Sequence, residues 1–213
     1  MSFFEPPEIP DEPEPYTPIS PPEWIGPPRN MVGAPVAERV IIVQRDDLVI
    51  AVTSMISFPT GVKLRLLTRS LRDEIGDLMS GRRWMHADRE FGGNLPDEVF
   101  RLGVVTEHGR AVDYRPFAGT GGVAGFGYAD AGRPEPPQLV PSSGGGGSGD
   151  WEQEYWLWPL PPDGVFEFVC EWPAMHVAET HVAVDPAPIR AAAECAITLW
   201  DEPPPGADHP WVY

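Results

Sequence analysis

The sequence predicts a mostly β protein, an antiparallel β-sandwich with one short helix near its C-terminal end. Short β-branched and aromatic runs recur from residue 39 onward, and turn signals separate them. These runs do not alternate with helical patterns, as the strands of a parallel sheet would. About seven strands joined by short turns fit an immunoglobulin-like sandwich, and a barrel is the alternative.

A β meander is predicted in the first half of the chain. Arg39–Val43 is a β-branched run, and Leu48–Ser57 is apolar on both faces, as expected for a central strand. Val62–Arg69 alternates apolar and mostly basic residues, so one face of this strand should be buried and the other solvated. Polar residues at 45–47 and the Pro-Thr-Gly sequence at 59–61 supply the two connecting turns.

Five further strands are predicted in the second half of the chain, at residues 99–106, 111–114, 154–158, 165–172 and 178–184. In the run at 165–172, four apolar side chains fall on one face, which predicts a core strand. These side chains are Phe166, Phe168, Cys170 and Trp172.

Helical spacing occurs in two places. A short helix is predicted within residues 71–79, where apolar residues recur three and four positions apart. A second helix is predicted over residues 186–200, with Asp185 as its cap and Pro186 at its first position. The apolar stripe of this helix, which should pack on the sheet, consists of Ile189, Ala193, Ala196 and Trp200.

Proline and glycine, with 28 and 22 copies in 213 residues, are unevenly distributed and delimit the domain. Residues 1–35 are acidic and proline-rich, which predicts a disordered tail ahead of a single β-sandwich domain at 36–202. We expect a mobile glycine-rich loop at 117–150 and a second tail at 203–213. Trp24 should pack back on the domain, and the alternative is a peptide-like motif for a partner's groove.

The net charge of −17 limits the classes of partner. Nucleic acid and anionic membranes would be repelled, so we expect neither as a partner. The N-terminal sequence lacks the basic and apolar regions of a signal peptide, and no apolar run is long enough to span a membrane. We therefore expect a cytoplasmic protein in which both cysteines are reduced.

Two groups of residues have the side chains of metal ligands. His176, Glu179 and His181 lie close together in the sequence. In a strand, Glu179 and His181 point to the same face and His176 could reach from the preceding turn, and zinc accepts such ligands. A second group alternates within a predicted loop and consists of His86, Asp88 and Glu90. A complete site needs a further ligand and supporting groups, so we interpret both groups as solvated polar positions. We assign no metal, cofactor or catalytic residue.

Two other patterns are formally reminiscent of enzymes. Gly119–Ala124 has the spacing of a dinucleotide fingerprint, but the strand before it and the helix after it are missing from the pattern. Cys170 could act as a nucleophile with His176 or His181 as its base. Its place on an aromatic strand face instead indicates a small buried hydrophobe, and we interpret Cys195 in the same way.

Carboxylates and tryptophans suggest two more kinds of site. Glu167 and Glu171 share the polar face of one predicted strand, which favours solvated surface over a catalytic pair. Four tryptophans would form a carbohydrate-stacking platform if they pointed outward, and part of the core if they pointed inward. We interpret these four as core residues; they are Trp151, Trp156, Trp158 and Trp172.

The stretch Trp156–Pro173, which includes Trp-Leu-Trp-Pro-Leu-Pro-Pro-Asp-Gly and Phe-Val-Cys-Glu-Trp-Pro, carries a resemblance. Together with Glu179-Thr180 and the predicted helix ending in Leu199-Trp200, it resembles a group of uncharacterised actinobacterial hypothetical proteins. Those proteins also begin with a proline-rich tail and a β meander. The resemblance implies a bacterial cytoplasmic protein with a β-sandwich, and it implies no catalytic residue.

The sequence favours a non-catalytic binding or structural module, because no catalytic, metal or nucleotide motif stands out. We expect a protein or peptide partner, recognised through a sheet face, a sheet edge or the loops. One alternative is a metal-dependent hydrolase that uses His176, Glu179 and His181. The other is a carbohydrate or small-ligand binder that uses outward aromatic residues.

Overall fold

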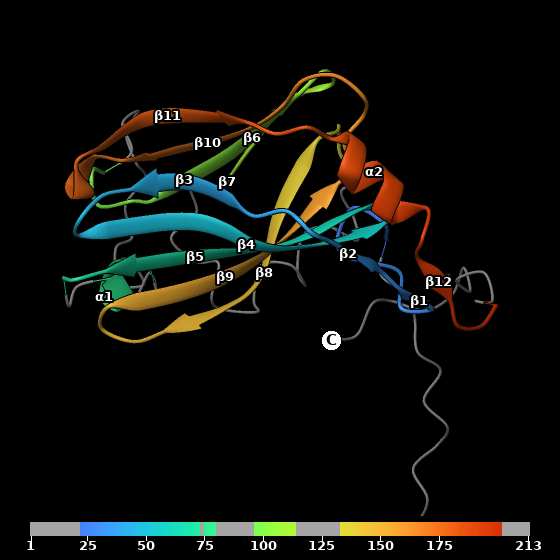
Figure 1. The fold of residues 1–213 in the computed structure, drawn as a ribbon, viewed down its shortest axis with the longest axis horizontal. Coiled ribbons are helices and arrows are strands. Elements are labelled where there is room, and N and C mark those ends of the chain that lie inside the picture. The colour runs from blue at the N-terminus through green and yellow to red at the C-terminus, as the bar shows by residue number, and fades with distance from the viewer. Residues whose placement is uncertain (1–21, 73–74, 80–95, 114–132, 202–213) are drawn as a thin grey trace, which may run out of the picture.

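The fold is that of a computed structural model, which describes residues 22–72, 75–79, 96–113 and 133–201. Within these residues the strands form three antiparallel sheets, accompanied by two short α-helices and one 3-10 turn. The predicted fold class, mostly β with antiparallel sheets and a helix near the C-terminal end, is confirmed. Figure 1 shows two main layers, with the β10 and β11 layer above the β4, β5 and β9 layer.

The larger sheet has six strands and contains the predicted meander. Two of them, β2 and β3, pair with β4 at successive positions along one edge, and the order continues through β5 and β9 to β8. The tight turn between β4 and β5 falls at the predicted Pro-Thr-Gly sequence. The strands are β2 (Ala34–Val36), β3 (Val40–Gln44), β4 (Leu48–Phe58), β5 (Gly61–Ser70), β8 (Gln138–Gly146) and β9 (Asp150–Trp158).

The smaller sheet has four strands in the order β11-β10-β6-β7. Its strands are β6 (Arg101–Thr106), β7 (Gly109–Asp113), β10 (Phe166–Trp172) and β11 (Val177–Ala183). Each of them overlaps a strand predicted from the sequence. β11 contacts β3 and β7 contacts β8, so the two sheets meet along both edges.

The main core lies between the two sheets. Val62, Leu64 and Leu66 of β5 point into it, as the alternation of that strand predicted. From the other sheet, β10 contributes the four predicted residues, each at most 2% exposed; they are Phe166, Phe168, Cys170 and Trp172. Aromatic side chains bury large apolar areas, so β10 dominates this side of the core.

Both predicted helices form, at reduced length. α1 (Ile75–Met79) buries Ile75 and Leu78 and contacts β9 and β5. α2 (Ala187–Ala193) begins where Asp185 Oδ1 accepts a hydrogen bond from the Ala187 amide at 2.9 Å, which is the expected capping interaction. α2 packs on β4, where the Ser57 hydroxyl donates to the Ile189 carbonyl at 2.8 Å.

The end of the second helix was predicted wrongly. α2 ends at Ala193, and Trp200 is 56% exposed instead of lying on the packed stripe. Residues Ile197–Thr198 form β12, which pairs with β1 (Met31–Val32) in a separate two-stranded sheet. The β-branched side chains of Ile197 and Thr198 favour this strand, and its pairing overrides the local helical spacing.

The expectation of a mobile loop over residues 117–150 is wrong from residue 138 onward, because β8 and the start of β9 occupy this segment. The glycines permit a close approach of the two strands. A Cβ at Gly144 would overlap the Gln153 side chain, and one at Gly146 would overlap the Asp150 backbone. Gln153 Nε2 also donates to the Ser143 carbonyl at 2.8 Å, which holds β8 in place.

The prediction of a disordered tail over residues 1–35 is wrong for residues 22–35, because these residues belong to the fold. Trp24 packs on the domain, as predicted, with its ring centroid 6.3 Å from that of Trp158. β1 and β2 follow in the same segment. Pro35 is accommodated because β2 lies at the edge of its sheet, where a strand tolerates a residue without an amide donor.

Several predictions concern residues outside the described ranges. These residues are the first part of the N-terminal tail (1–21), the group at 86–90, the fingerprint at 119–124 and the C-terminal tail (203–213). Within the described ranges, no helix has the length and apolar character needed to cross a membrane.

Candidate functional site

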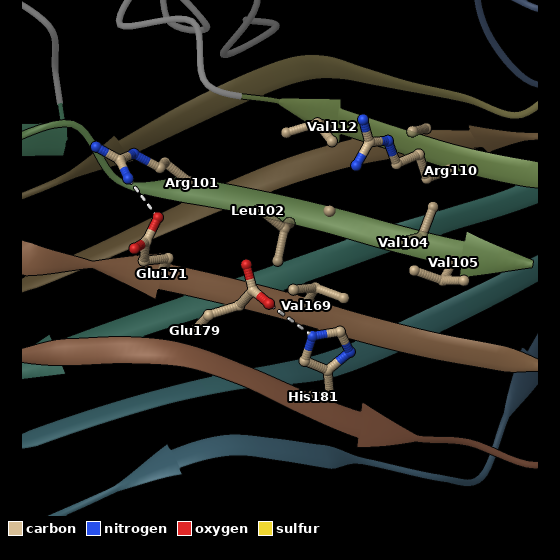
Figure 2. Close-up of a pocket in the computed structure, with 12 residues that line it drawn as sticks. Arg101, Leu102, Val104, Val105, Arg110, Val112, Val169, Glu171, Glu179 and His181 are labelled. Carbon is tan, nitrogen blue, oxygen red and sulfur yellow. Dashed lines mark hydrogen bonds and ion pairs between the residues drawn. The ribbon is translucent and has the colours of Figure 1, made fainter. Parts of the chain in front are cut away.

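The outer face of the smaller sheet carries Glu179 and His181, which lie two residues apart on one face of β11, as predicted (Figure 2). His181 lies between two carboxylates: its Nδ1 is 3.0 Å from Glu167 Oε2, and its Nε2 is 3.1 Å from Glu179 Oε1. The hydrogen bond to Glu167, followed by that to Glu179, raises the pKa of His181 above its usual 6.5. The cationic form of the histidine is therefore favoured.

His176, the third residue of the predicted metal group, does not join this pair. It follows the 3-10 turn η1 (Pro173–Met175) in the left-handed conformation, with φ of 54°. Its backbone carbonyl accepts a hydrogen bond from Arg45 at 3.2 Å, which ties the smaller sheet to the turn before β4. Across the described part of the chain, no group of three or more His, Cys, Asp and Glu side chains is placed to hold a metal ion.

We predict that an NMR titration will give His181 a pKa above 6.5, and that Glu167→Gln will lower it, since that variant replaces the carboxylate that raises the pKa most with a neutral amide. Because the folded-state pKa is raised, the stabilisation from protonated His181 is complete below pH 6.5 and disappears as the pH rises through the folded-state pKa. Glu179→Gln is the matched comparison, with a smaller decrease expected. An unchanged His181 pKa in the Glu167→Gln variant would contradict the contact between Glu167 and His181.

A hollow of about 210 Å³ lies beside His181 on the same sheet face. Gly103 of β6 lines it between its cross-strand neighbours Val169 and Val112. Arg101 and Glu171 form an ion pair at the rim, visible in Figure 2. The hollow thus has an apolar floor, and the charges of this pair neutralise each other.

The cysteines differ in their surroundings. Cys170 is 1% exposed, and burial, with a smaller contribution from the charge of Glu171, raises its pKa to about 12. Its thiol stays protonated at neutral pH, so the interpretation as a buried hydrophobe is confirmed. Cys195 is exposed, and the prediction that it is buried is wrong because α2 ends before it.

The four tryptophans of the proposed carbohydrate platform are buried. Their exposed fractions lie between 0% and 7%; the residues are Trp151, Trp156, Trp158 and Trp172. The interpretation of these side chains as core residues is confirmed. They present no aromatic surface on which a sugar ring could stack.

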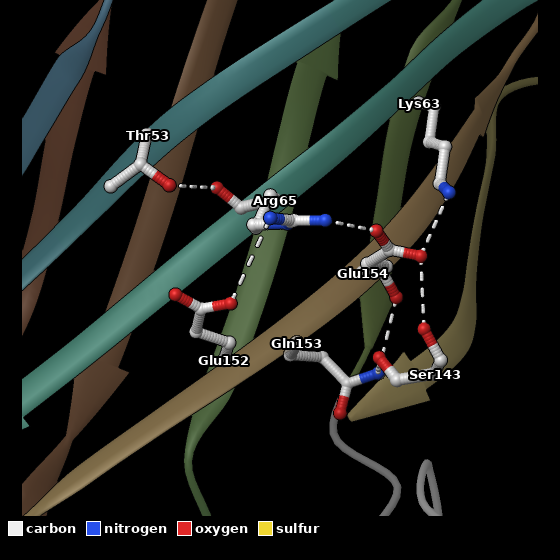
Figure 3. A network of polar contacts seen from close by, with 7 residues as sticks. All are labelled: Thr53, Lys63, Arg65, Ser143, Glu152, Gln153 and Glu154. Atoms are coloured by element: carbon white, nitrogen blue, oxygen red, sulfur yellow. Dashed lines mark hydrogen bonds and ion pairs between the residues drawn. The ribbon is translucent and has the colours of Figure 1, made fainter. Parts of the chain in front are cut away.

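A polar network covers the outer face of the larger sheet (Figure 3). Glu154 of β9 accepts from Arg65 at 2.9 Å and from the Ser143 hydroxyl at 2.9 Å, and it pairs with Lys63 at 2.8 Å. Burial of this carboxyl opposes its ionisation, but the hydrogen bonds from Lys63, Arg65 and Ser143 outweigh burial and lower its pKa to about 2. The network joins three neighbouring strands, and its charges are neutralised within it.

An exposed apolar surface lies at one end of the molecule, beside α2 in Figure 1. We call it the β1–β12 ribbon and define it as residues 30–32 and 197–200. The ribbon is closed by a hydrogen bond from the Leu199 amide to the Asn30 carbonyl at 2.7 Å, and by one from Asn30 Nδ2 to the Trp200 carbonyl at 3.1 Å. Its exposed large side chains are Val32 (51%), Ile197 (62%), Leu199 (48%) and Trp200 (56%).

The ribbon differs from other exposed apolar positions because its members are contiguous. Val32 and Ile197 are direct cross-strand partners, and Leu199 follows two residues after Ile197, just beyond the end of β12. The remaining large exposed apolar residues of the described ranges lie in separate parts of the chain: Ile41 in β3, Val112 in β7, and Leu71 and Val165 in connecting segments. Sequence reasoning missed the ribbon because it assigned residues 197–200 to a helix, although the β-branched Ile197-Thr198 pair was a signal for a strand.

Comparisons with known proteins supply no relative on which to base a function. No protein-family model matches the chain, and neither a curated protein nor a solved structure is significantly similar to it. The class of protein is therefore defined by its fold and surface: an antiparallel β protein of two packed sheets, with an exposed apolar ribbon at one end. The resemblance to actinobacterial proteins stays a prediction.

Proposed function

We propose that this protein is a non-catalytic module that binds a protein partner, and that the β1–β12 ribbon is the contact surface. The single observation that carries the proposal is the contiguous exposure of Val32, Ile197 and Leu199, with Trp200 next in the chain. Contiguous apolar surface on a soluble domain is typical of a contact site, because solvating it costs free energy that a partner removes.

The partner that fits this surface is an extended segment with alternating apolar residues, flanked by lysine or arginine. Among the described residues the ribbon is a two-stranded sheet, so each of its strands offers an outer edge to which another strand can add. Alternate side chains of an added strand would meet Ile197 and Leu199. The chain's net charge of −17 favours a basic partner, since opposite charge speeds encounter and strengthens binding at the rim.

A selection from a displayed library of random peptides tests the proposal. We expect the full chain to enrich basic peptides with alternating apolar residues. Ile197→Lys should weaken the binding of these peptides at least about tenfold, because it places a charge in the centre of an apolar contact. Ile41→Lys is the matched control: Ile41 is also an isoleucine on a strand, is 53% exposed, and belongs to the larger sheet.

Retention of binding by the Ile41→Lys chain, together with its loss in the Ile197→Lys chain, would support the proposal. Equal binding by both variants would place the contact elsewhere, and a selection without any enriched peptide would reject the ribbon as a peptide site. Both variants should keep the unfolding midpoint of the parent chain, because exposed positions contribute little to stability.

A further inference from the structure

A second aromatic cluster lies on the outer face of the larger sheet, opposite the main core. Alternate residues of β9 separate the two: Tyr155 and Leu157 belong to the main core, whereas Trp156 and Trp158 belong to this cluster. We call it the Trp156–Trp158 cluster; its buried members are Phe58, Val140, Trp156 and Trp158. Trp24, Met31 and Ile56 pack against it.

The cover of this cluster is the segment Pro22–Pro28, here called the anchor segment. Trp24 meets Trp158 edge to face, with ring centroids 6.3 Å apart and planes at 64°. The indole Nε1 of Trp156 donates to the Glu23 carbonyl at 2.8 Å. Arg133 completes the contact, because it lies 4.9 Å from the centre of the Trp158 ring and pairs with the Glu23 carboxylate at 2.7 Å.

The anchor segment is held to the described part of the domain by these side-chain contacts. Its only backbone–backbone bonds within the described ranges are local, from Ile25 to Pro22 and from Met31 to Pro28. The prolines at 22, 27 and 28 have no amide hydrogen to offer to a strand. The Trp24 indole Nε1 is buried without an acceptor among the described residues, which disfavours the docked state. The segment can therefore leave the cluster without breaking a β ladder.

We propose that the Trp156–Trp158 cluster is a binding site for a tryptophan-bearing turn with a preceding acidic residue, and that the anchor segment fills it in cis. An equivalent segment of another polypeptide would bind in trans when the cis anchor is released. The chemistry is specific at three points: an indole packs on Trp158, a backbone carbonyl accepts from Trp156, and a carboxylate pairs with Arg133. A buried tryptophan anchor is a common source of binding energy in such contacts. This site is separate from the β1–β12 ribbon, so the proposal does not depend on the ribbon's function.

The test uses the full chain with Trp24→Ala, which removes the anchor ring and leaves β1 and β2 in place. The probe is a synthetic peptide of residues 22–30, measured by titration calorimetry. We expect saturable binding to the Trp24→Ala chain and at least about tenfold weaker binding to the parent chain, because the tethered anchor competes at millimolar effective concentration. The matched control peptide carries the Trp24→Ala change and should not bind.

A charge exchange provides a second, independent variant in case Trp24→Ala alters the fold. In the full chain, Arg133→Glu should release the anchor through repulsion with Glu23, and a peptide carrying Glu23→Lys should bind this variant better than the unchanged peptide does. If the peptides bound neither the Trp24→Ala chain nor the Arg133→Glu chain, the proposal would be overturned. So would equal binding of the peptides with and without Trp24, or equal affinity of the parent and Trp24→Ala chains. These outcomes are distinct from failure of the ribbon, whose test compares Ile197→Lys with Ile41→Lys and leaves the anchor segment unchanged.

Discussion

Replacement of Trp172 by alanine is expected to destabilise the domain by about 3–5 kcal/mol. Trp172 is fully buried between the sheets, and its ring centroid lies 5.3 Å from that of Phe100 in an edge-to-face contact. Its Nε1 donates to the Glu98 carbonyl at 2.9 Å. Alanine would leave a cavity where the ring was and a carbonyl without its donor, and both changes disfavour the folded state.

Denaturant unfolding of the two chains measures this difference directly. Trp200→Ala is the matched control, because it makes the same substitution at a residue that is 56% exposed. We expect this control to change the free energy of unfolding by less than about 0.5 kcal/mol. Similar losses in both variants would show that Trp200 is packed as tightly as Trp172, and would remove the basis for an exposed ribbon.

These two tryptophans also show where sequence reasoning succeeded and where it failed. Trp172 continues the alternation of Phe166, Phe168 and Cys170, and a period of two along one strand is a local signal that predicted its burial. Trp200 stands at helical spacing from Ile189, which was also a local signal. That signal was overridden by the pairing of β12 with β1, a contact between the two ends of the described chain.

The candidate surfaces depend on the same kind of long-range pairing. The sequence placed Glu179 and His181 on one face of a strand, and this was correct. The approach of Glu167 to His181 depends on the register of β10 against β11, in which Val169 lies opposite His181. Neither this register nor the pairing of Val32 with Ile197 leaves a trace in a single sequence, because each joins segments whose patterns are independent.

The turns, in contrast, were predictable because their geometry depends on adjacent residues. The Pro-Thr-Gly sequence at 59–61 fixes its own backbone geometry, so the connection between β4 and β5 followed from adjacent residues. Glycine, in contrast, does not predict a single backbone structure. It permits a loop, but it also permits two strands to approach closely, and the choice between them depends on the facing strand. For residues 144–146 that strand is β9, which the local pattern does not reveal.

A substitution at Gly144 distinguishes a mobile loop from a strand that lies close to its neighbour. If residues 142–149 formed a mobile loop, valine would be tolerated equally at Gly144 and at Gly145. In the folded structure a Cβ at Gly144 overlaps the Gln153 side chain, whereas one at Gly145 meets nothing within 4 Å. We therefore expect Gly144→Val to destabilise the domain by about 1–3 kcal/mol through overpacking against β9.

Gly145→Val is the matched control, and it should be neutral or slightly stabilising, because valine suits an exposed strand position better than glycine does. Thermal unfolding gives the stability of each variant, and hydrogen exchange of the β8 amides shows whether the change is local. Gln153 links the two effects: displaced by the new side chain, it would lose its hydrogen bond to the Ser143 carbonyl, and the neighbouring amides of β8 should then exchange faster. Identical behaviour of the two variants would contradict the strand and restore the mobile loop.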